Sequence, residues 1–333
     1  MIVVPSKFLF RLFEDKIGND IRSQTKVYKR WIKKDKVVYS VEKEIDVKTL
    51  QIKYKRPITF RETQFSRFII VYDKQLGSIP FEAVEGNKIV FGVGLEGLVT
   101  IPLNTEINSL LIAGCSGSGK SSMTKSIITN LILNNIPTWV MDNKKSHDYD
   151  VFENHLPLYK GIEQFSEFLN KVSNELDSRL LKKHNKPLVI VIDEVFSIKL
   201  LKNGKILLDK LAVLLSTCRG GNVHFIIVSQ RSTTSVLPSE ITTHISIRVA
   251  LQQSTKQESI NVIYSDDAYY ITSKGRGYLS INGRLNEFCA FYLTDTEIEE
   301  RLPKVDKISP VEDVKIVKNY VIGGNTYGDD RKR

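Results

Sequence analysis

The sequence has little cysteine and histidine, which argues against a fold held by disulfides or by a cysteine–histidine metal site. Its 333 residues include three cysteines, Cys115, Cys218 and Cys289. They are too few and too scattered for a disulfide framework. The five histidines show no metal-ligand spacing with them. We therefore expect a reduced, cytoplasmic protein.

Long apolar runs are also missing. A membrane-spanning helix needs roughly 20 apolar residues, and no stretch approaches that length. Near the N-terminus, the short runs 2–5 and 8–10 are interrupted by Pro5, Lys7 and Arg11, and no small-residue cleavage site follows. We expect neither an intrinsic membrane span nor a removable signal.

The sequence does contain an excess of basic residues. Its 48 lysines and arginines outnumber 38 aspartates and glutamates, for a formal net charge of +10. This excess favours a polyanionic partner, either nucleic acid or an acidic membrane surface, without choosing between them. The length exceeds the usual limit of a single core, so we expect a large α/β domain and a smaller one.

Hydrophobic patterning divides the chain into three parts. Residues 1–95 are basic and carry alternating strand patterns at 36–41 and 67–72, which predicts a small β-rich or α+β domain. Over 96–302, apolar strands alternate with helical patterns, which predicts a parallel sheet covered on both faces. The polar tail 303–333 is expected to be flexible. The strands expected in the large domain are 110–113, 138–141, 188–192, 225–229 and 245–251.

Two helices and a hairpin are predicted around these strands. The first helix places six apolar residues on one face: Phe165, Phe168, Leu169, Val172, Leu176 and Leu180. The second is expected over about 206–218. Two later strands, 277–281 and 288–292, are separated by Asn282-Gly283, a strong hairpin turn signal.

Residues 114–121 read Gly-Cys-Ser-Gly-Ser-Gly-Lys-Ser, a complete G-x-x-x-x-G-K-[ST] phosphate loop. Its glycines let backbone N–H groups point at phosphates, Lys120 can reach the β/γ-phosphates, and Ser121 can ligate Mg²⁺. An accidental glycine-rich turn is the alternative, and the strand-loop-helix context argues against it. Nucleotide contacts are expected from Gly114, Cys115, Ser116, Gly117, Ser118, Gly119, Lys120, Ser121 and Ser122.

An acidic pair follows about 70 residues after the loop, where the apolar run 188–192 ends in Asp193 and Glu194. Ligands of a doubly wound sheet gather at the carboxyl ends of its strands. Asp193 is therefore expected to hold Mg²⁺, and Glu194 to polarise the attacking water. A strand that merely stops at two acids is the alternative. The two motifs together predict an ATPase that uses ATP and Mg²⁺.

Two further polar residues have an expected role and a simpler alternative. Gln230 ends the strand 225–229, where it would sense the γ-phosphate or only cap the strand. Arg219 ends a helix before Gly220-Gly221-Asn222, where it would reach a neighbouring subunit's ATP and stabilise transition-state charge. Capping of its own helix, favoured by the dipole, is the alternative.

From about residue 92 to 302 the chain resembles the FtsK/SpoIIIE family of DNA-translocating ATPases. The segments that match in family order are 110–121, 141–144, 175–179, 193–194, 219–224, 229–231, 247–249, 275–279 and 294–298. Two segments depart from the family pattern. The family's Asp-Pro-Lys is here Asp142-Asn143-Lys144, and its later Asp-Ser-Arg is Glu258-Ser259-Ile260.

The resemblance implies a RecA-like motor that forms a ring, most often a hexamer, and threads double-stranded DNA through its centre by ATP hydrolysis. It implies catalytic roles for Lys120, Glu194, Gln230 and Arg219, with Arg248 as a less favoured residue across the interface. The family's pore-facing region implies DNA contacts at Lys199, Lys202 and Lys205, and Arg231 is expected to join them. A solvated helix start is the alternative for the three lysines.

We expect neither the winged-helix module nor the membrane anchor of chromosome-segregating members, which favours transfer of a plasmid or an integrative element. A relaxase or a membrane transfer subunit would then be a partner. A plasmid or phage replication helicase or loader is the alternative enzyme. A nucleotide-switched DNA-binding module is the alternative outside catalysis, and Glu194 argues against it.

The basic stretch from Arg22 to Lys36 surrounds Tyr28 and Trp31. It could follow a phosphate backbone while an aromatic ring stacks on an exposed base. It could equally be a solvated helix face with both rings packed inward, or a docking site for a transfer partner.

Overall fold

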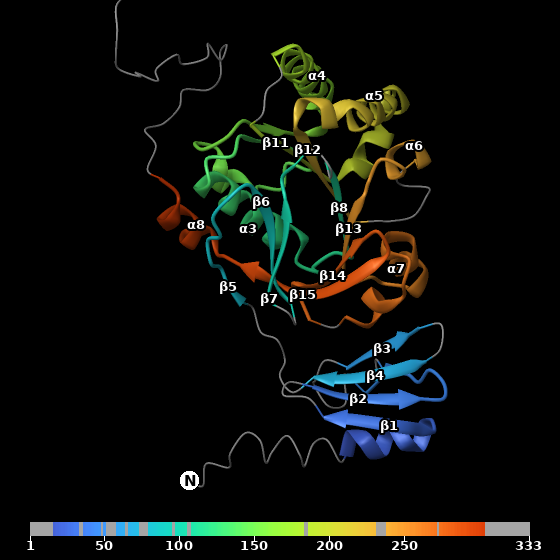
Figure 1. Ribbon diagram of the computed structural model, residues 1–333. Coiled ribbons are helices and arrows are strands. Elements are labelled where there is room, and N and C mark those ends of the chain that lie inside the picture. The colour runs from blue at the N-terminus through green and yellow to red at the C-terminus, as the bar shows by residue number, and fades with distance from the viewer. Residues whose placement is uncertain are drawn as a thin grey trace, which may run out of the picture.

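The strand patterns fold into two separate sheets in the computed structural model (Figure 1). The structure describes residues 16–303, apart from 33–35, 48, 51–57, 64–65, 73–78, 95–96, 105–107, 183–185, 231–237 and 272. The expected tail from residue 304 onward and Arg231 therefore lie outside the described residues.

The smaller sheet is antiparallel, with strand order β1-β2-β4-β3. Its strands are β1 (Val27–Ile32), β2 (Lys36–Val41), β3 (Ile58–Glu62) and β4 (Arg67–Tyr72). Its core contains Ile17 and Ile21 of a helix at 16–24, which pack against inward-facing strand residues such as Tyr39 and Phe60. The strands expected at 36–41 and 67–72 are confirmed. The helix-face interpretation is wrong for 27–32, because this stretch pairs with β2 as an edge strand.

Among the described residues, the larger sheet has eleven strands, and its parallel half follows the order β10-β9-β11-β12-β8-β13. The strands of this half are β8 (Ser109–Ala113), β9 (Thr138–Asp142), β10 (Leu158–Lys160), β11 (Leu188–Asp193), β12 (Val223–Ser229) and β13 (Ile247–Leu251). Four of the five expected strands extend by one or two residues, and the fifth starts at Ile247 rather than 245.

An antiparallel half continues the large sheet in the order β14-β15-β6-β7, and β5 pairs with β15. These strands are β5 (Ile79–Pro80), β6 (Lys88–Gly94), β7 (Gly97–Pro102), β14 (Arg276–Ile281) and β15 (Arg284–Tyr292). Asn282 and Gly283 have φ of 50° and 78°, as the tight hairpin turn requires, so the predicted hairpin is confirmed.

Helices cover both faces of the parallel half. Alternate residues of β11 belong to two different cores, Ile190 to one with α4 and α5 and Val191 to one with α3. The predicted α/β architecture with a covered parallel sheet is therefore confirmed. The helices are α3 (Lys120–Leu133), α4 (Phe165–Lys182), α5 (Gly204–Thr217), α6 (Ser239–Thr242), α7 (Lys256–Ile263) and α8 (Asp295–Arg301). Short 3₁₀ turns are η1 (Asp150–Phe152), η2 (Ile162–Gln164), η3 (Val195–Leu200), η4 (Cys218–Gly221) and η5 (Asp267–Tyr270).

The chain enters the large sheet earlier than the expected boundary after residue 95. β6 lies within residues 1–95, yet it pairs with β15 and β7, and its Ile89, Val90 and Phe91 are buried in the large domain's core. Local patterning does not reveal a strand's partner, so the sequence alone places the boundary after residue 95. We propose a boundary between Tyr72 and Ile79.

Within the described part of the chain, no helix combines the length and apolarity needed to cross a membrane.

Candidate nucleotide site

Strand register brings the predicted site residues to one edge of the large sheet. Asp193 at the end of β11 pairs with Asp142 of β9 on one side and Val228 of β12 on the other. Ser229 of β12 pairs with Ala113, the residue before the phosphate loop. Because these strands are parallel, the loop, the acidic pair and Gln230 emerge at the same carboxyl edge.

The phosphate loop is held by backbone contacts with the chain beside it. The Cys115 N–H donates to Gln252 O at 2.8 Å, and the Gly275 N–H donates to Ser118 O at 3.0 Å. Gly119 has φ of +103°, and a Cβ there would lie 2.9 Å from the Gly275 nitrogen. Only glycine therefore fits at residue 119.

Helix α3 begins at Lys120, within the loop motif. Its N-cap, Gly119, provides no side-chain hydrogen bond. The first-turn N–H groups consequently lack a capping side chain, and the positive end of the helix faces the loop. This is the arrangement that binds phosphate.

Lys120 lies folded over its own loop. Its Nζ donates to Gly114 O at 2.8 Å and to Cys115 O at 2.9 Å. Burial lowers the pKa of Lys120 and nearby Lys144 lowers it further, while Asp193 and Glu194 oppose both effects. The ammonium is thus held on the loop carbonyls, close enough to the acidic pair for both carboxylates to act on its pKa.

Asp193 is a buried acid, 2% exposed, at the centre of the edge. Burial raises its pKa to about 6, and the carboxylates of Glu194 and Asp142 add to the rise, whereas Lys144 opposes it. The Tyr149 hydroxyl donates to Asp193 Oδ2 at 3.3 Å. A carboxylate that is this costly to ionise gains from a bound cation.

Glu194 is held in a left-handed backbone conformation, with φ of 52°. Such a conformation costs a non-glycine residue on the order of 1 kcal/mol and often marks a functional position. Asn143 helps to hold it, because its Nδ2 donates to Asp193 O at 2.9 Å. The glutamate's Oε2 lies 2.7 Å from Lys144 Nζ in an ion pair.

The segment that carries Lys144 is ordered by Asp142. Its Oδ1 accepts the Lys144 N–H at 3.0 Å, and its Oδ2 accepts the Ser146 N–H at 2.9 Å. At the position where the FtsK/SpoIIIE pattern has proline, Asn143 supplies a side-chain donor to the end of β11. The departure noted in the sequence therefore becomes a contact inside the site.

Sequence reasoning assigned no role in the site to Lys144, Asn143 or Tyr149. A signal was available for two of them, because 142–144 directly follows a predicted strand, and parallel strands end at a common edge. Tyr149 lies beyond that strand end in the chain, and only the fold brings its hydroxyl to Asp193.

The other predicted residues are distributed as follows. Gln230 is half-buried at the loop's edge. Arg219 is exposed in η4, which precedes the amino end of β12 and so lies at the opposite edge of the sheet. Lys199 is half-exposed in η3, and Lys202 and Lys205 are exposed near the start of α5. The fold thus brings Gln230 to the site of its own chain but not Arg219.

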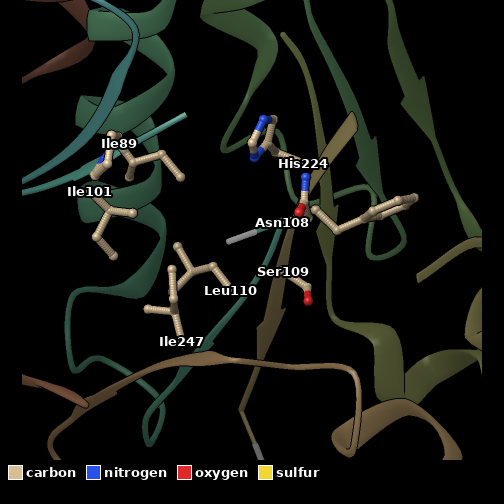
Figure 2. Close-up of a pocket in the computed structure, with 9 residues that line it drawn as sticks. Ile89, Ile101, Asn108, Ser109, Leu110, His224 and Ile247 are labelled. Carbon is tan, nitrogen blue, oxygen red and sulfur yellow. The ribbon is translucent and has the colours of Figure 1, made fainter. Parts of the chain in front are cut away.

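A small hollow lies at the opposite, amino-terminal edge of the sheet (Figure 2). Ile89, Ile101, Leu110 and Ile247 make it largely apolar. The histidine that lines the hollow already has a hydrogen-bond partner, because a ring nitrogen of His224 lies 2.9 Å from Asn222 Oδ1. The hollow is separate from the candidate site.

The donor set at the carboxyl edge fits Mg²⁺ bound together with a nucleotide. Ser121 supplies a hydroxyl in the first turn of α3, and Asp193 supplies a buried carboxylate. In the described residues, no group of three or more His, Cys, Asp and Glu side chains could hold a metal ion. Mg²⁺ here would therefore complete its coordination with phosphate oxygens and water, its usual preference.

No protein-family model matches the chain. Among curated proteins, DNA translocase FtsK of Staphylococcus aureus is 25% identical over 253 residues, covering 64% of this chain and 32% of that protein. DNA translocase FtsK of Halalkalibacterium halodurans is 23% identical over 297 residues, covering 75% and 37%. The chain thus spans about a third of the length of the curated relatives it matches.

Solved structures share the fold. The pCW3 conjugation coupling protein TcpA, in monomer form with ATPγS, has a TM-score of 0.65 at 18% identity, over 88% of this chain and 97% of that one. The type VII secretion ATPase EccC of Thermomonospora curvata has a TM-score of 0.56 at 18% identity, over 71% and 34%. These likenesses show a RecA-like P-loop ATPase fold. Together with the sequence relatives, they confirm the resemblance seen in the motifs: the chain is similar to DNA translocases of the FtsK type.

Proposed function

We propose that this chain hydrolyses ATP to pump double-stranded DNA as a ring-forming translocase, in the transfer of a plasmid or integrative element. One observation carries the proposal. The acidic pair 193–194 lies beside the phosphate loop at a single sheet edge, in the register of β11, β12 and β8.

Each residue at this edge has a definable task. Lys120 and the loop amides bind the phosphates, and Ser121 and Asp193 would hold Mg²⁺, which neutralises phosphate charge when bound. Glu194 takes a proton from the attacking water once its carboxylate leaves Lys144. Gln230, at the same edge, lies where it can contact the γ-phosphate side of the site.

The ring and the DNA path are supported by position. Arg219 is exposed and lies away from its own chain's site, as an arginine offered to a neighbour must be. Lys202 and Lys205 are exposed a few residues beyond Glu194, where they can contact backbone phosphates without reading sequence. A hexamer would place these lysines around the duplex.

The transfer role is supported by likeness to a conjugation coupling protein. TcpA matches this chain over nearly its whole length in the structure. A relaxase or a membrane transfer subunit is the partner that such a role requires.

The test is ATP hydrolysis by the full chain, measured with duplex DNA, single-stranded DNA and no DNA. We expect several-fold stimulation by duplex, no nucleotide binding in Lys120→Ala, and retained binding with roughly 10²-fold or greater loss of hydrolysis in Glu194→Gln. If the hydrolysis rate is the same with duplex DNA, with single-stranded DNA and without DNA, the proposed translocase function is overturned. Single-strand preference with strand separation would assign a replication helicase instead.

A further inference from the structure

The basic excess of this chain is concentrated in the small domain. Residues 1–72 contain 17 lysines and arginines against eight aspartates and glutamates. Residues 73–333 contain 31 against 30. Nine of the ten surplus positive charges therefore belong to the small domain, and the ATPase domain is close to neutral. A polyanion would be attracted first to the small domain.

The small sheet has one face that lies away from its core. Tyr39 and Ile69 point into the core, and alternation places Val38, Phe68 and Ile70 on the other face. Trp31 pairs with Val38 across β1 and β2, and its ring lies 6.2 Å from that of Phe68, tilted by 54°. Trp31, Val38 and Phe68 are all half-exposed.

Lysines flank the aromatic rings of β1. Lys29 Nζ lies 5.3 Å from the centre of the Trp31 ring, and Lys26 Nζ lies 5.4 Å from that of Tyr28. Tyr28 is 59% exposed, and both lysines are exposed. Acidic neighbours are also present, since the Tyr28 hydroxyl donates weakly to Glu42 at 3.4 Å and Arg67 is paired with Glu62 at 2.6 Å.

We propose that this outer face, centred on Lys29, Trp31 and Phe68, binds single-stranded nucleic acid. Exposed rings on an open sheet can stack on unpaired bases, while adjacent lysines neutralise the backbone phosphates. A duplex buries its base faces, so the rings would have nothing to stack on. A lipid surface would use the same positive charges but would not need a ring-on-base geometry.

This inference goes beyond the proposed function, because it requires neither ATP nor movement along DNA. The binding face is built from β1, β2 and β4, whereas the phosphate loop belongs to the other sheet. A full chain carrying Lys120→Ala should therefore still bind a single strand. Loss of translocation and loss of this binding are separable results.

The experiment uses Trp31 as its own reporter. The chain has two tryptophans, Trp31 and Trp139, so Trp139→Phe leaves Trp31 alone. In that full-length background, oligo(dT) should quench the fluorescence, and anisotropy of labelled oligo(dT) should report affinity. Lys29→Ala and Trp31→Ala should each weaken binding at least fivefold, and added salt should weaken it further.

A matched control is available in the ATPase domain. Lys171 lies 5.2 Å from the Tyr159 ring, so Lys171→Ala removes the same kind of contact elsewhere and should leave affinity unchanged. DNA-independent ATP hydrolysis that Lys29→Ala leaves unchanged would establish that this variant is folded. Unchanged fluorescence with unchanged affinity in Lys29→Ala would overturn the proposal. If Trp31→Ala lowers the affinity for duplex DNA or for phosphatidylserine vesicles as much as it lowers the affinity for oligo(dT), the proposal is overturned as well.

Discussion

Among single residues, Lys144 affects two carboxylates at once. It is paired with Glu194 at 2.7 Å, and its charge opposes the rise in the pKa of Asp193. In Lys144→Met, the Asp193 pKa should rise further, because burial and the neighbouring carboxylates act without a counter-charge. We expect the acid limb of the kcat/KM profile for ATP to move to higher pH. In Lys144→Arg the acid limb should return to the pH seen in the unsubstituted chain. If the acid limb does not move in Lys144→Met, Lys144 does not set the pKa of Asp193.

Asp193 also predicts a pH-dependent stability. Its pKa is about 6 in the folded chain against an ordinary value of 3.8. Below 3.8 the carboxyl is protonated in both folded and unfolded chains. As pH rises through about 6, the folded chain must hold a buried charge that the unfolded chain solvates, so stability falls by at most about 3 kcal/mol.

Asp193→Asn removes that loss. In EDTA and without nucleotide, we expect its Tm to exceed that of the unsubstituted chain at pH 8, with the difference shrinking toward pH 4. Thermal melts across this range provide the measurement. A difference that stays constant with pH would mean that the Asp193 charge is not the cause.

At the level of elements, η5 and the turn after it connect the two sheets. Tyr270, 2% exposed, belongs to the small domain's core, and its hydroxyl donates to Glu44 and to Asp266. Lys256 pairs with Glu44. Five residues after Tyr270, Gly275 donates to the phosphate loop at Ser118. One short segment therefore touches both the small domain and the nucleotide site.

The contact between Glu44 and Tyr270 predicts that substitutions at these two residues have non-additive effects on the free energy of unfolding. Burial opposes ionisation of Glu44, but Lys256 and Tyr270 hold its pKa below the ordinary value. Tyr270→Phe and Glu44→Gln should each lower the free energy of unfolding by about 1 kcal/mol, the usual net value of a hydrogen bond. The double variant should lose little more than either single one, as measured by urea unfolding. Fully additive losses would mean that the two side chains do not cooperate.

At the level of the whole molecule, the proposed ring requires residues from two subunits at each site. Arg219→Ala and Glu194→Gln chains should each be inactive alone. Mixed together, they should regain part of the DNA-stimulated hydrolysis, because an intact Glu194 meets an intact Arg219 across some interfaces. Mixing two different Glu194 variants should restore nothing. If Arg219→Ala alone has normal activity, Arg219 does not act at a neighbouring subunit's ATP, and capping of its own helix is the remaining role.

The sequence by itself determined the features that depend on local order. The phosphate loop 114–121, the acidic pair after an apolar strand and the Asn282-Gly283 turn are contiguous, so spacing alone identifies their chemistry. The parallel, covered sheet was also predictable, because strands buried on both faces read as continuous apolar runs.

Tertiary structure alone decided which segments become neighbours. The order β9-β11-β12-β8 brings Lys144 and Tyr149 to the acidic pair, and the pairing of β6 with β15 supports the earlier domain boundary that we propose. A helix face is one of three interpretations that the sequence leaves open for 27–32, because charged and aromatic residues obscure the strand alternation, and the pairing with β2 excludes it. Strand pairing is chosen by the packing of the whole core, and a local pattern carries no information about residues a hundred positions away.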